Sequence, residues 1–271
     1  ALPPGRTYAG MRANWGERIR IGQIPWYRVL VFEGMQVVSP PLPSINLNSD
    51  LMFHFNDQDP ASYDLFDVRY VVMPGGLAKP DFLTPLLTTR RYAIYRAPSS
   101  GAATLAAQTV RRSADNKLNL FFANRAWLLS AEPSQRSFIR WDYPAPLGPT
   151  GVPVTGCAQG AVTNEVLAPD SVSVVTTCPT PGTLVFKTTY HPNWHVTIDG
   201  IEQPAFMASP SYVGVEVPEG RHEVRAEYRT SPVRTALLIL GGATLVAVLV
   251  WGITGARWLP ALQRRMRAES D

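Results

Sequence analysis

The stretch that most constrains this chain is an apolar run near its C-terminus, TALLILGGATLVAVLVWGI at Thr235 to Ile253. No charged residue occurs from Thr235 to Ala256, and about 22 helical residues span roughly 33 Å, enough to cross the hydrocarbon core of a bilayer. A buried helix of a soluble domain is the alternative, but such helices are usually shorter and keep a polar stripe. The run therefore predicts a transmembrane helix over residues 233–256.

The charges after this helix predict its orientation. Residues 257–271 carry the basic side chains Arg257, Arg264, Arg265 and Arg267, with Trp251 and Trp258 near the membrane interface. Cytoplasmic flanks are enriched in Lys and Arg, so we expect a cytoplasmic tail and an extracytoplasmic region 1–232 at a cell membrane. The chain begins at Ala1 and shows no signal-peptide pattern. We therefore expect an N-terminal part of the same protein with earlier membrane spans, and we expect that part to be a partner of this region.

Composition predicts a folded, mainly β region before the helix. The chain is 45% hydrophobic and 17% charged, which excludes disorder for most of it, and its 25 prolines and 20 glycines favour short strands with many turns. The pI near 9.2 comes from an excess of arginine. No dense basic run interleaved with aromatics occurs outside the tail, so we expect membrane lipid and no nucleic acid as a partner.

Three segments precede the helix in this interpretation. Residues 1–140 are predicted to form an α+β subdomain, residues 141–156 a connector rich in Pro and Gly, and residues 157–232 an antiparallel β-sandwich. The fold class is thus mainly β with some α+β, followed by a single transmembrane helix. Six strands are expected in the last segment: Glu165 to Ala168, Ser171 to Thr177, Thr183 to Tyr190, Trp194 to Ile198, Val213 to Val217 and His222 to Tyr228.

The first segment contains fewer clear signals. The β-branched run Val68 to Met73 predicts a buried strand, which is expected to pair with a strand at Arg90 to Pro98. Between them, Ala78 to Leu87 is predicted to be a short helix or loop. Asn119 to Ser130 is predicted to supply one or two further strands.

The two cysteines, Cys157 and Cys178, flank a predicted strand pair. Outside the cytoplasm they are expected to form one disulfide, and two independent buried thiols are the alternative. In the chain-entropy model, the bridge would contribute on the order of 3 kcal/mol. It would also agree with the extracytoplasmic placement.

No motif in the sequence predicts catalysis, a metal or a cofactor. Asp57 and Asp59 form an Asp-x-Asp pattern, and two carboxylates at this spacing in a turn are able to bind one divalent cation. An Asx turn that caps a helix near Ser62 is the simpler alternative. His191 and His195 are four residues apart, yet Pro192 argues against a shared helix and no third ligand follows. We therefore predict a non-catalytic chain without a metal.

The segment Gly182 to Tyr228 resembles the C-terminal extracytoplasmic segment of bacterial YfhO-type membrane proteins. The likeness rests on Leu184-Val185, Tyr190, Pro192, Trp194, Asp199-Gly200, Gly214, Pro218, Gly220, His222, Val224 and Tyr228. Upstream, DLFDVRYVVMP, YAIYRAP and NRAWLL resemble other segments of the same family. Asn193 departs from the family, which usually has Gly after the proline.

This resemblance implies a function for the region as part of a larger protein. YfhO-type proteins resemble GT-C glycosyltransferases, which use polyprenyl-phosphate sugars and carry their acidic catalytic residues in an early loop between membrane helices. The resemblance thus implies a non-catalytic accessory domain in cell-envelope glycan or lipid-linked sugar transfer. Whether the parent protein is a polyprenyl-phosphate-sugar-dependent glycosyltransferase stays open.

Two hypotheses for this domain follow. In the first, Tyr190, Trp194 and Tyr212, helped by Asp199, stack on and hydrogen-bond a glycan or lipid-linked sugar and guide it as the acceptor. In the second, the aromatic residues are core side chains, and the region is a structural capping domain without a ligand. A fully buried Trp194 favours the second hypothesis, and an exposed Trp194 beside Asp199 favours the first.

Overall fold

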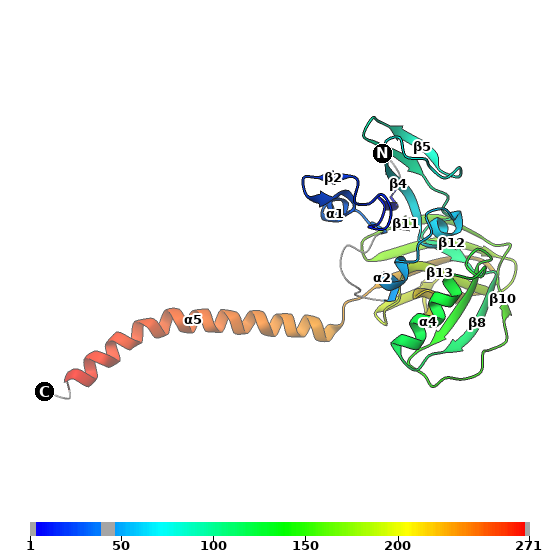
Figure 1. Cartoon of the computed structure of the whole chain (residues 1–271). Coiled ribbons are helices and arrows are strands. Elements are labelled where there is room, and N and C mark those ends of the chain that lie inside the picture. Colours follow the sequence, from blue (N-terminus) through cyan, green and yellow to red (C-terminus); the bar gives the residue numbers. More distant parts are fainter. Residues whose placement is uncertain (1–3, 39–46, 269–271) are drawn as a thin grey trace. The chain divides into compact units, whose positions relative to one another are not determined.

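The chain consists of two compact units, residues 1–228 and residues 229–271. The computed structural model describes residues 4–38 and 47–268 (Figure 1). The first unit is mostly strand, and the second is a helix, α5, that covers Pro232–Ala268. The predicted fold class, mainly β with antiparallel sheets and one apolar C-terminal helix, is confirmed.

The largest sheet has seven strands and includes segments from both sides of the predicted connector. Its order is β10-β8-β9-β16-β17-β13-β7. The strands are β7 (Ala103–Leu105), β8 (Gln108–Ser113), β9 (Ser137–Asp142), β10 (Val154–Thr155), β13 (Gly182–Thr189), β16 (Phe206–Ala208) and β17 (Tyr212–Val217). Residues on the two sides of 141–156 thus lie within one sheet and one compact unit.

A second sheet of five strands packs on the first to form a sandwich. Its order is β11-β12-β18-β14-β15, with β11 (Ala161–Leu167), β12 (Ser171–Cys178), β14 (Trp194–Ile198), β15 (Ile201–Gln203) and β18 (Gly220–Tyr228). All its pairs are antiparallel, and β12 pairs with β18 without interruption from Ser171↔Glu227 to Cys178↔Gly220. Six predicted strands of this region are present.

Alternation along the strands explains the sandwich core. Leu184 and Phe186 of β13 are fully buried together with Val196 and Val224 of the facing sheet. The side chains between them, such as Val185, point to the opposite face and join a second core. Since successive strand residues point to opposite faces, the seven-stranded sheet is buried on both sides.

The helix α4 (Lys117–Leu128) covers part of that second face. It connects the parallel strands β8 and β9, beside which it lies in Figure 1. The prediction of strands at Asn119 to Ser130 is therefore wrong. Asn116 caps the helix, because its side chain accepts the N–H of Asn119 at 2.9 Å, and the buried residues Leu120, Asn124 and Trp127 recur at helical spacing.

The N-terminal part carries a four-stranded sheet of order β1-β4-β6-β5. Its strands are β1 (Arg6–Tyr8), β4 (Val68–Pro74), β5 (Thr84–Thr88) and β6 (Tyr92–Arg96). The predicted pairing of the strands near Val68 and Tyr92 is confirmed, since β4 and β6 are antiparallel. The expected helix or loop at Ala78 to Leu87 instead ends in β5, which pairs with β6 at the exposed edge.

Short elements complete this part of the chain. A two-stranded hairpin, β2 (Arg20–Ile21) and β3 (Ile24–Pro25), leads directly into α1 (Trp26–Phe32). The helices α2 (Leu47–Met52) and α3 (Pro60–Leu65) follow. Aromatic side chains of β1, α3 and their surroundings pack together there, with the rings of Tyr8 and Phe55 centred 4.5 Å apart.

The helix α5 contains a segment with the properties of a membrane span. Val233–Ile253 is 21 residues long and apolar, which corresponds to roughly 32 Å of helix. Every side chain in this segment is exposed. A 21-residue apolar helix without buried side chains is unsuited to water, so length, composition and exposure together fit a membrane-spanning helix.

Candidate functional site

The four side chains predicted to bind a glycan do not form one site. Trp194 and Asp199 stand at opposite ends of β14, five residues apart, which is about 16 Å along a strand. Tyr212 is buried within the sheet, and its hydroxyl donates to the carbonyl oxygen of Leu65 at 3.0 Å. Its ring is therefore inaccessible to a sugar, and it acts as a core residue. Tyr190 is half-buried. Its backbone N–H donates to the carbonyl oxygen of Ser211, the residue before Tyr212.

Trp194 is half-buried, between the two extremes that separated the hypotheses. Its indole Nε1–H donates to the carbonyl oxygen of Thr189 at 3.0 Å. Its ring meets the ring of Tyr228 nearly edge-on, with centroids 5.5 Å apart. The hydrogen bond and the aromatic contact fix one edge of the indole, which leaves another part of its surface accessible.

That accessible part of Trp194 lines a groove of about 480 Å³. The polar groups in its wall include Arg6, Gln36 and Thr188. The remaining lining comes from the chain before β1 and after α1, from the β11–β12 turn and its flanks, and from single residues next to β4, next to β7 and in β13: Pro4, Gly5, Gly34, Met35, Leu167, Ala168, Pro169, Val172, Asp67, Ala102 and Lys187. An aromatic face next to hydrogen-bonding groups in a concave surface is an arrangement that can hold a small polar ligand.

Asp199 has a different role, at the tight turn between β14 and β15. Asp199 and Gly200 both have positive φ, 50° and 82°, as a two-residue hairpin turn of this kind requires. One Asp199 oxygen accepts from His222 Nδ1 at 2.7 Å, and the other accepts the N–H of Glu223 at 2.9 Å. The carboxylate thus joins the turn to β18.

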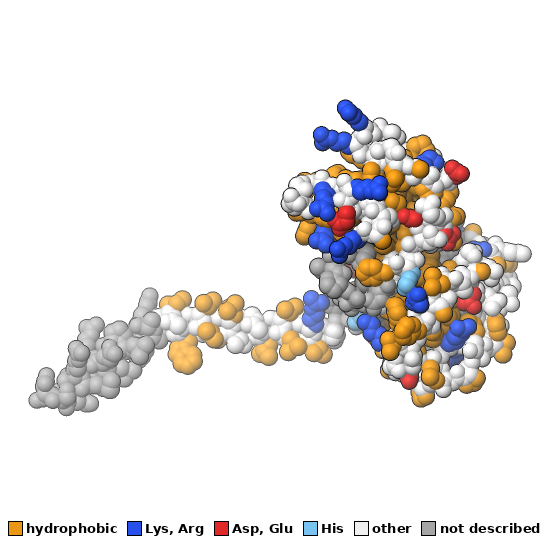
Figure 2. Space-filling view, in the orientation of Figure 1, with side chains coloured by type: hydrophobic (Ala, Val, Ile, Leu, Met, Phe, Trp, Pro, Cys, Tyr) orange, Lys and Arg blue, Asp and Glu red, His pale blue; other side chains and the backbone are white. Residues whose placement is uncertain are grey.

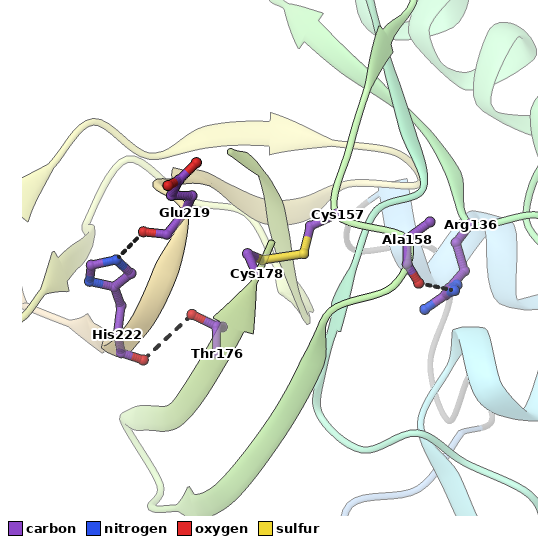
Figure 3. Close-up of a disulfide and its surroundings, with 7 residues drawn as sticks. All are labelled: Arg136, Cys157, Ala158, Thr176, Cys178, Glu219 and His222. Carbon is purple, nitrogen blue, oxygen red and sulfur yellow. Dashed lines mark hydrogen bonds between the residues drawn. A yellow bond between two sulfur atoms is a disulfide. The ribbon is translucent and has the colours of Figure 1, made fainter. Parts of the chain in front are cut away.

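His222 is held between two acceptors. Its Nε2 lies 2.9 Å from the carbonyl oxygen of Glu219 (Figure 3). Its other ring nitrogen, Nδ1, makes the contact with Asp199. Two acceptors favour the imidazolium form, so these hydrogen bonds raise the pKa of His222 above its usual value, and the bond from His222 lowers the pKa of Asp199. The pair is a structural contact that connects the β14–β15 turn to β18 at the surface of the sandwich.

The most buried charged group of the described chain was not predicted from the sequence. Lys187 on β13 is 2% exposed, and its Nζ donates to the carbonyl oxygen of Asp64 at 2.6 Å, to Asp64 Oδ1 at 3.0 Å and to Ser100 Oγ at 3.0 Å. The signal was present, because Lys187 shares the inward face of β13 with Val185. A lysine at an inward strand position requires a buried partner.

Burial and ion pairing act in opposite directions on this pair. Burial lowers the pKa of Lys187, while Asp64 and Asp67 oppose the shift. Burial alone would raise the pKa of Asp64, but Lys187 and the N–H of Ser100 outweigh it, so the pKa lies below the usual value. The Asp64 carboxylate thus opposes the effect of burial on Lys187, and Nζ donates to three acceptors.

This geometry is unsuited to a lysine-activated serine. Lys187 is held as an ion pair and does not present a free base to Ser100. The neighbouring backbone donors are also engaged, since the N–H groups of Ser100, Gly101 and Ala102 donate to Asp64, Ser99 and Glu165 respectively. No oxyanion is stabilised by donors that are already occupied. The cluster therefore joins α3 and the loop after β6 to β13 as a structural contact.

Cys157 and Cys178 form a disulfide, which closes the sandwich at the end of β12 (Figure 3). The two Cα atoms are 5.7 Å apart, and the sequence separation of the two cysteines is 21. Both cysteines are buried in the sandwich core. The bridge ties the chain that leaves β10 to the strand that pairs with β18.

The remaining candidate ligands are engaged in local structure. Asp59 caps α3, as its side chain accepts the N–H of Ala61 at 3.0 Å, and Asp57 accepts from the side chain of Asn14 at 2.8 Å. His195 contacts Glu202 at 2.5 Å, while His191 Nδ1 accepts the N–H of Asn193 at 3.1 Å. Within residues 4–38 and 47–268, no three His, Cys, Asp or Glu side chains lie together in a metal-binding group.

Comparison with known proteins gives no relative from which a role could be transferred. No protein-family model matches the chain, and no curated protein sequence matches it.

Proposed function

We propose that this chain is a non-catalytic, membrane-anchored domain that lies outside the cytoplasm, in a bacterial membrane protein of the YfhO type. The resemblance to this family is supported by the contacts that its motif residues make with each other. Asp199 pairs with His222, and Trp194 packs against Tyr228. Residues that build one fold element together are expected to recur together, so the motif describes the sandwich and not a reaction centre.

The domain's task in this proposal is to bind or guide a glycan or lipid-linked sugar acceptor for a parent protein that resembles GT-C glycosyltransferases. One observation carries this part, the groove of about 480 Å³ that Trp194 lines together with Arg6, Gln36 and Thr188. Indole faces stack on the apolar faces of sugar rings, and the polar groups around them hydrogen-bond the hydroxyls. The site is therefore centred on Trp194 and differs from the four residues first predicted.

A second candidate is a structural capping domain without a ligand. The Lys187–Asp64 pair and the buried Tyr212 favour it. In both cases a polar side chain is used to hold the fold together and is not available to a ligand. In this alternative, the groove is a gap between the N-terminal sheet and the sandwich, and the domain packs on the membrane-spanning part that YfhO-type proteins carry.

Glycan binding by the purified full chain in detergent separates the two candidates. We expect binding on an array of bacterial cell-envelope oligosaccharides, lost in Trp194→Ala and largely kept in Trp194→Phe, which retains an aromatic face. Tyr143→Ala is the matched control, since Tyr143 is an exposed aromatic residue outside the groove. Binding that is absent, or equally reduced by Tyr143→Ala, would contradict the acceptor role and leave the capping domain.

The anchoring is tested separately. Membranes that contain the chain are washed at alkaline pH with carbonate, which releases peripheral proteins but retains helices that cross the bilayer. We expect the wild-type chain to stay with the membrane. A variant with Leu240→Arg and Leu245→Arg should be released, because both substitutions place a charge in the apolar segment.

A further inference from the structure

A surface near the N-terminus combines exposed apolar side chains with arginines. It consists of the β2–β3 hairpin, α1 and the residues that flank them, and we call it the α1 surface: Ile21, Ile24, Val31, Phe32 and Met35, with Arg18, Arg20 and Arg28. Phe32 is 80% exposed, and Ile21 is 52% exposed. Figure 2 shows basic side chains gathered over α1 and the hairpin.

The spacing of α1 explains why these side chains point outward. Tyr27 and Leu30 are the buried residues of the helix and pack with Ala9 and Val72. Arg28 and Phe32 lie on the opposite face, and Val31 borders the buried side. The inward face of the helix therefore packs on a small core. Phe32, on the other face, is left exposed as a large apolar side chain.

The charge of this region is one-sided. Residues 1–38 contain five arginines and two acidic residues, Glu17 and Glu33. Arg20 is paired with Glu17, which leaves four arginines and Glu33 in this region. Apolar side chains bordered by excess positive charge complement a bilayer, which has an apolar interior and anionic headgroups at its surface.

The α1 surface also lies near the point where the chain leaves the first unit. Met35 and Trp194 line the same groove, and Trp194 contacts Tyr228, the last residue of β18. Only Arg229, Thr230 and Ser231 then separate β18 from α5. Four peptide units reach at most about 14 Å, so a bilayer that holds α5 must lie close to this end of the unit.

From these observations we propose that the α1 surface rests on the bilayer, with Phe32 and its apolar neighbours in the headgroup region and the arginines on anionic phospholipids. Apolar side chains of interfacial helices enter a membrane by about 5–10 Å. Phe32 is the deepest contact, because it is the most exposed apolar residue of the surface. This inference rests on α5 being the anchor and is independent of glycan binding.

A fluorescent label at Phe32 tests the contact in the full chain. The two native cysteines are joined to each other, so Phe32→Cys offers a single reactive thiol for a polarity-sensitive dye. The labelled chain is reconstituted into phosphatidylcholine vesicles with and without phosphatidylglycerol, each with a nitroxide quencher on the lipid acyl chain. Val152→Cys is the matched control, since Val152 is also an exposed apolar residue but lines a different groove.

The expected result is quenching of the label at residue 32, stronger for a shallow than for a deep nitroxide, with residue 152 unquenched. Arg18→Gln with Arg28→Gln should reduce the quenching only in vesicles with phosphatidylglycerol. A label at residue 32 that is blue-shifted but unquenched would mean that protein covers the surface, and it would overturn the inference. Equal quenching at both sites, or none, would do so as well.

The carbonate wash keeps this failure distinct from failure of the anchor. A chain that carbonate releases refutes the membrane anchor and this inference with it. A chain that carbonate leaves in the membrane, but whose residue 32 label is not quenched by lipid, refutes the inference alone.

Discussion

Removing the two partners of the Lys187–Asp64 pair one at a time should give unequal losses of stability. The Lys187 side chain is 1% exposed, whereas that of Asp64 is 35% exposed. Asp64→Ala leaves a buried ammonium with only neutral acceptors, Asp64's own carbonyl oxygen and Ser100 Oγ. Breaking a buried pair in this way costs about 3–5 kcal/mol.

Lys187→Met should cost much less. Methionine keeps an apolar stem of similar length, and the remaining Asp64 carboxylate reaches water and still accepts the N–H of Ser100. We expect a loss of about 1 kcal/mol, the typical net contribution of an intramolecular hydrogen bond. The double variant should resemble Lys187→Met, because no buried charge is left without a partner.

Thermal unfolding of the full chain in mild detergent, followed by tryptophan fluorescence, measures these losses. For a domain of this size each kcal/mol shifts the unfolding midpoint by roughly 2–4 °C. Asp64→Ala should thus lower the midpoint by roughly 6–20 °C, and Lys187→Met by roughly 2–4 °C. Equal losses, or a larger loss for Lys187→Met, would refute the view that a buried cation depends on Asp64.

Three further predictions use the same unfolding assay. Replacing Cys157 and Cys178 by Ser should cost about 3 kcal/mol, from the entropy of the loop that the disulfide closes, and an unchanged midpoint would mean that the bridge adds nothing. Tyr212→Phe should cost about 1–3 kcal/mol, because the Leu65 carbonyl oxygen loses its buried donor; a loss below that range would place water at the carbonyl. The pKa of His222 is raised in the folded chain, so its contribution is complete below pH 6.5 and fades as the pH rises through the higher folded pKa. His222→Gln should remove this part of the pH dependence, and an unaltered profile would assign it to other groups.

The strands after Cys157 were predictable because each is short, β-rich and ends at a turn residue. The Asp199-Gly200 turn is the clearest case, since its sequence matches the backbone that a tight hairpin needs. The long apolar helix near the C-terminus followed from length and apolarity alone. These features depend on neighbouring residues, so a single sequence contains the information for them.

What depended on distant residues was not predictable in the same way. The run NLFFANRAWLLS is rich in aromatic and apolar residues and suggested strands, but its cap at Asn116 and its position between two parallel strands make it helical. Tyr212 was predicted to contact a ligand, but its hydroxyl donates to the carbonyl oxygen of Leu65, which is distant in the sequence. The groove at Trp194 likewise needs segments near residues 5, 35, 168 and 188, which only the folded chain brings together.

The order of strands in the five-stranded sheet has a consequence for biosynthesis. β18 lies in the centre, between β12 and β14, yet it is the last strand to be synthesised. Until residues 220–228 have left the ribosome, β11–β12 and β14–β15 are two separate hairpins, each with an unpaired edge that can pair with another chain. The apolar helix follows after three residues, so the nascent chain completes its sheet at nearly the moment its most hydrophobic segment emerges. A chain that ends before Gly220 would expose these edges of β12 and β14 and would lack α5.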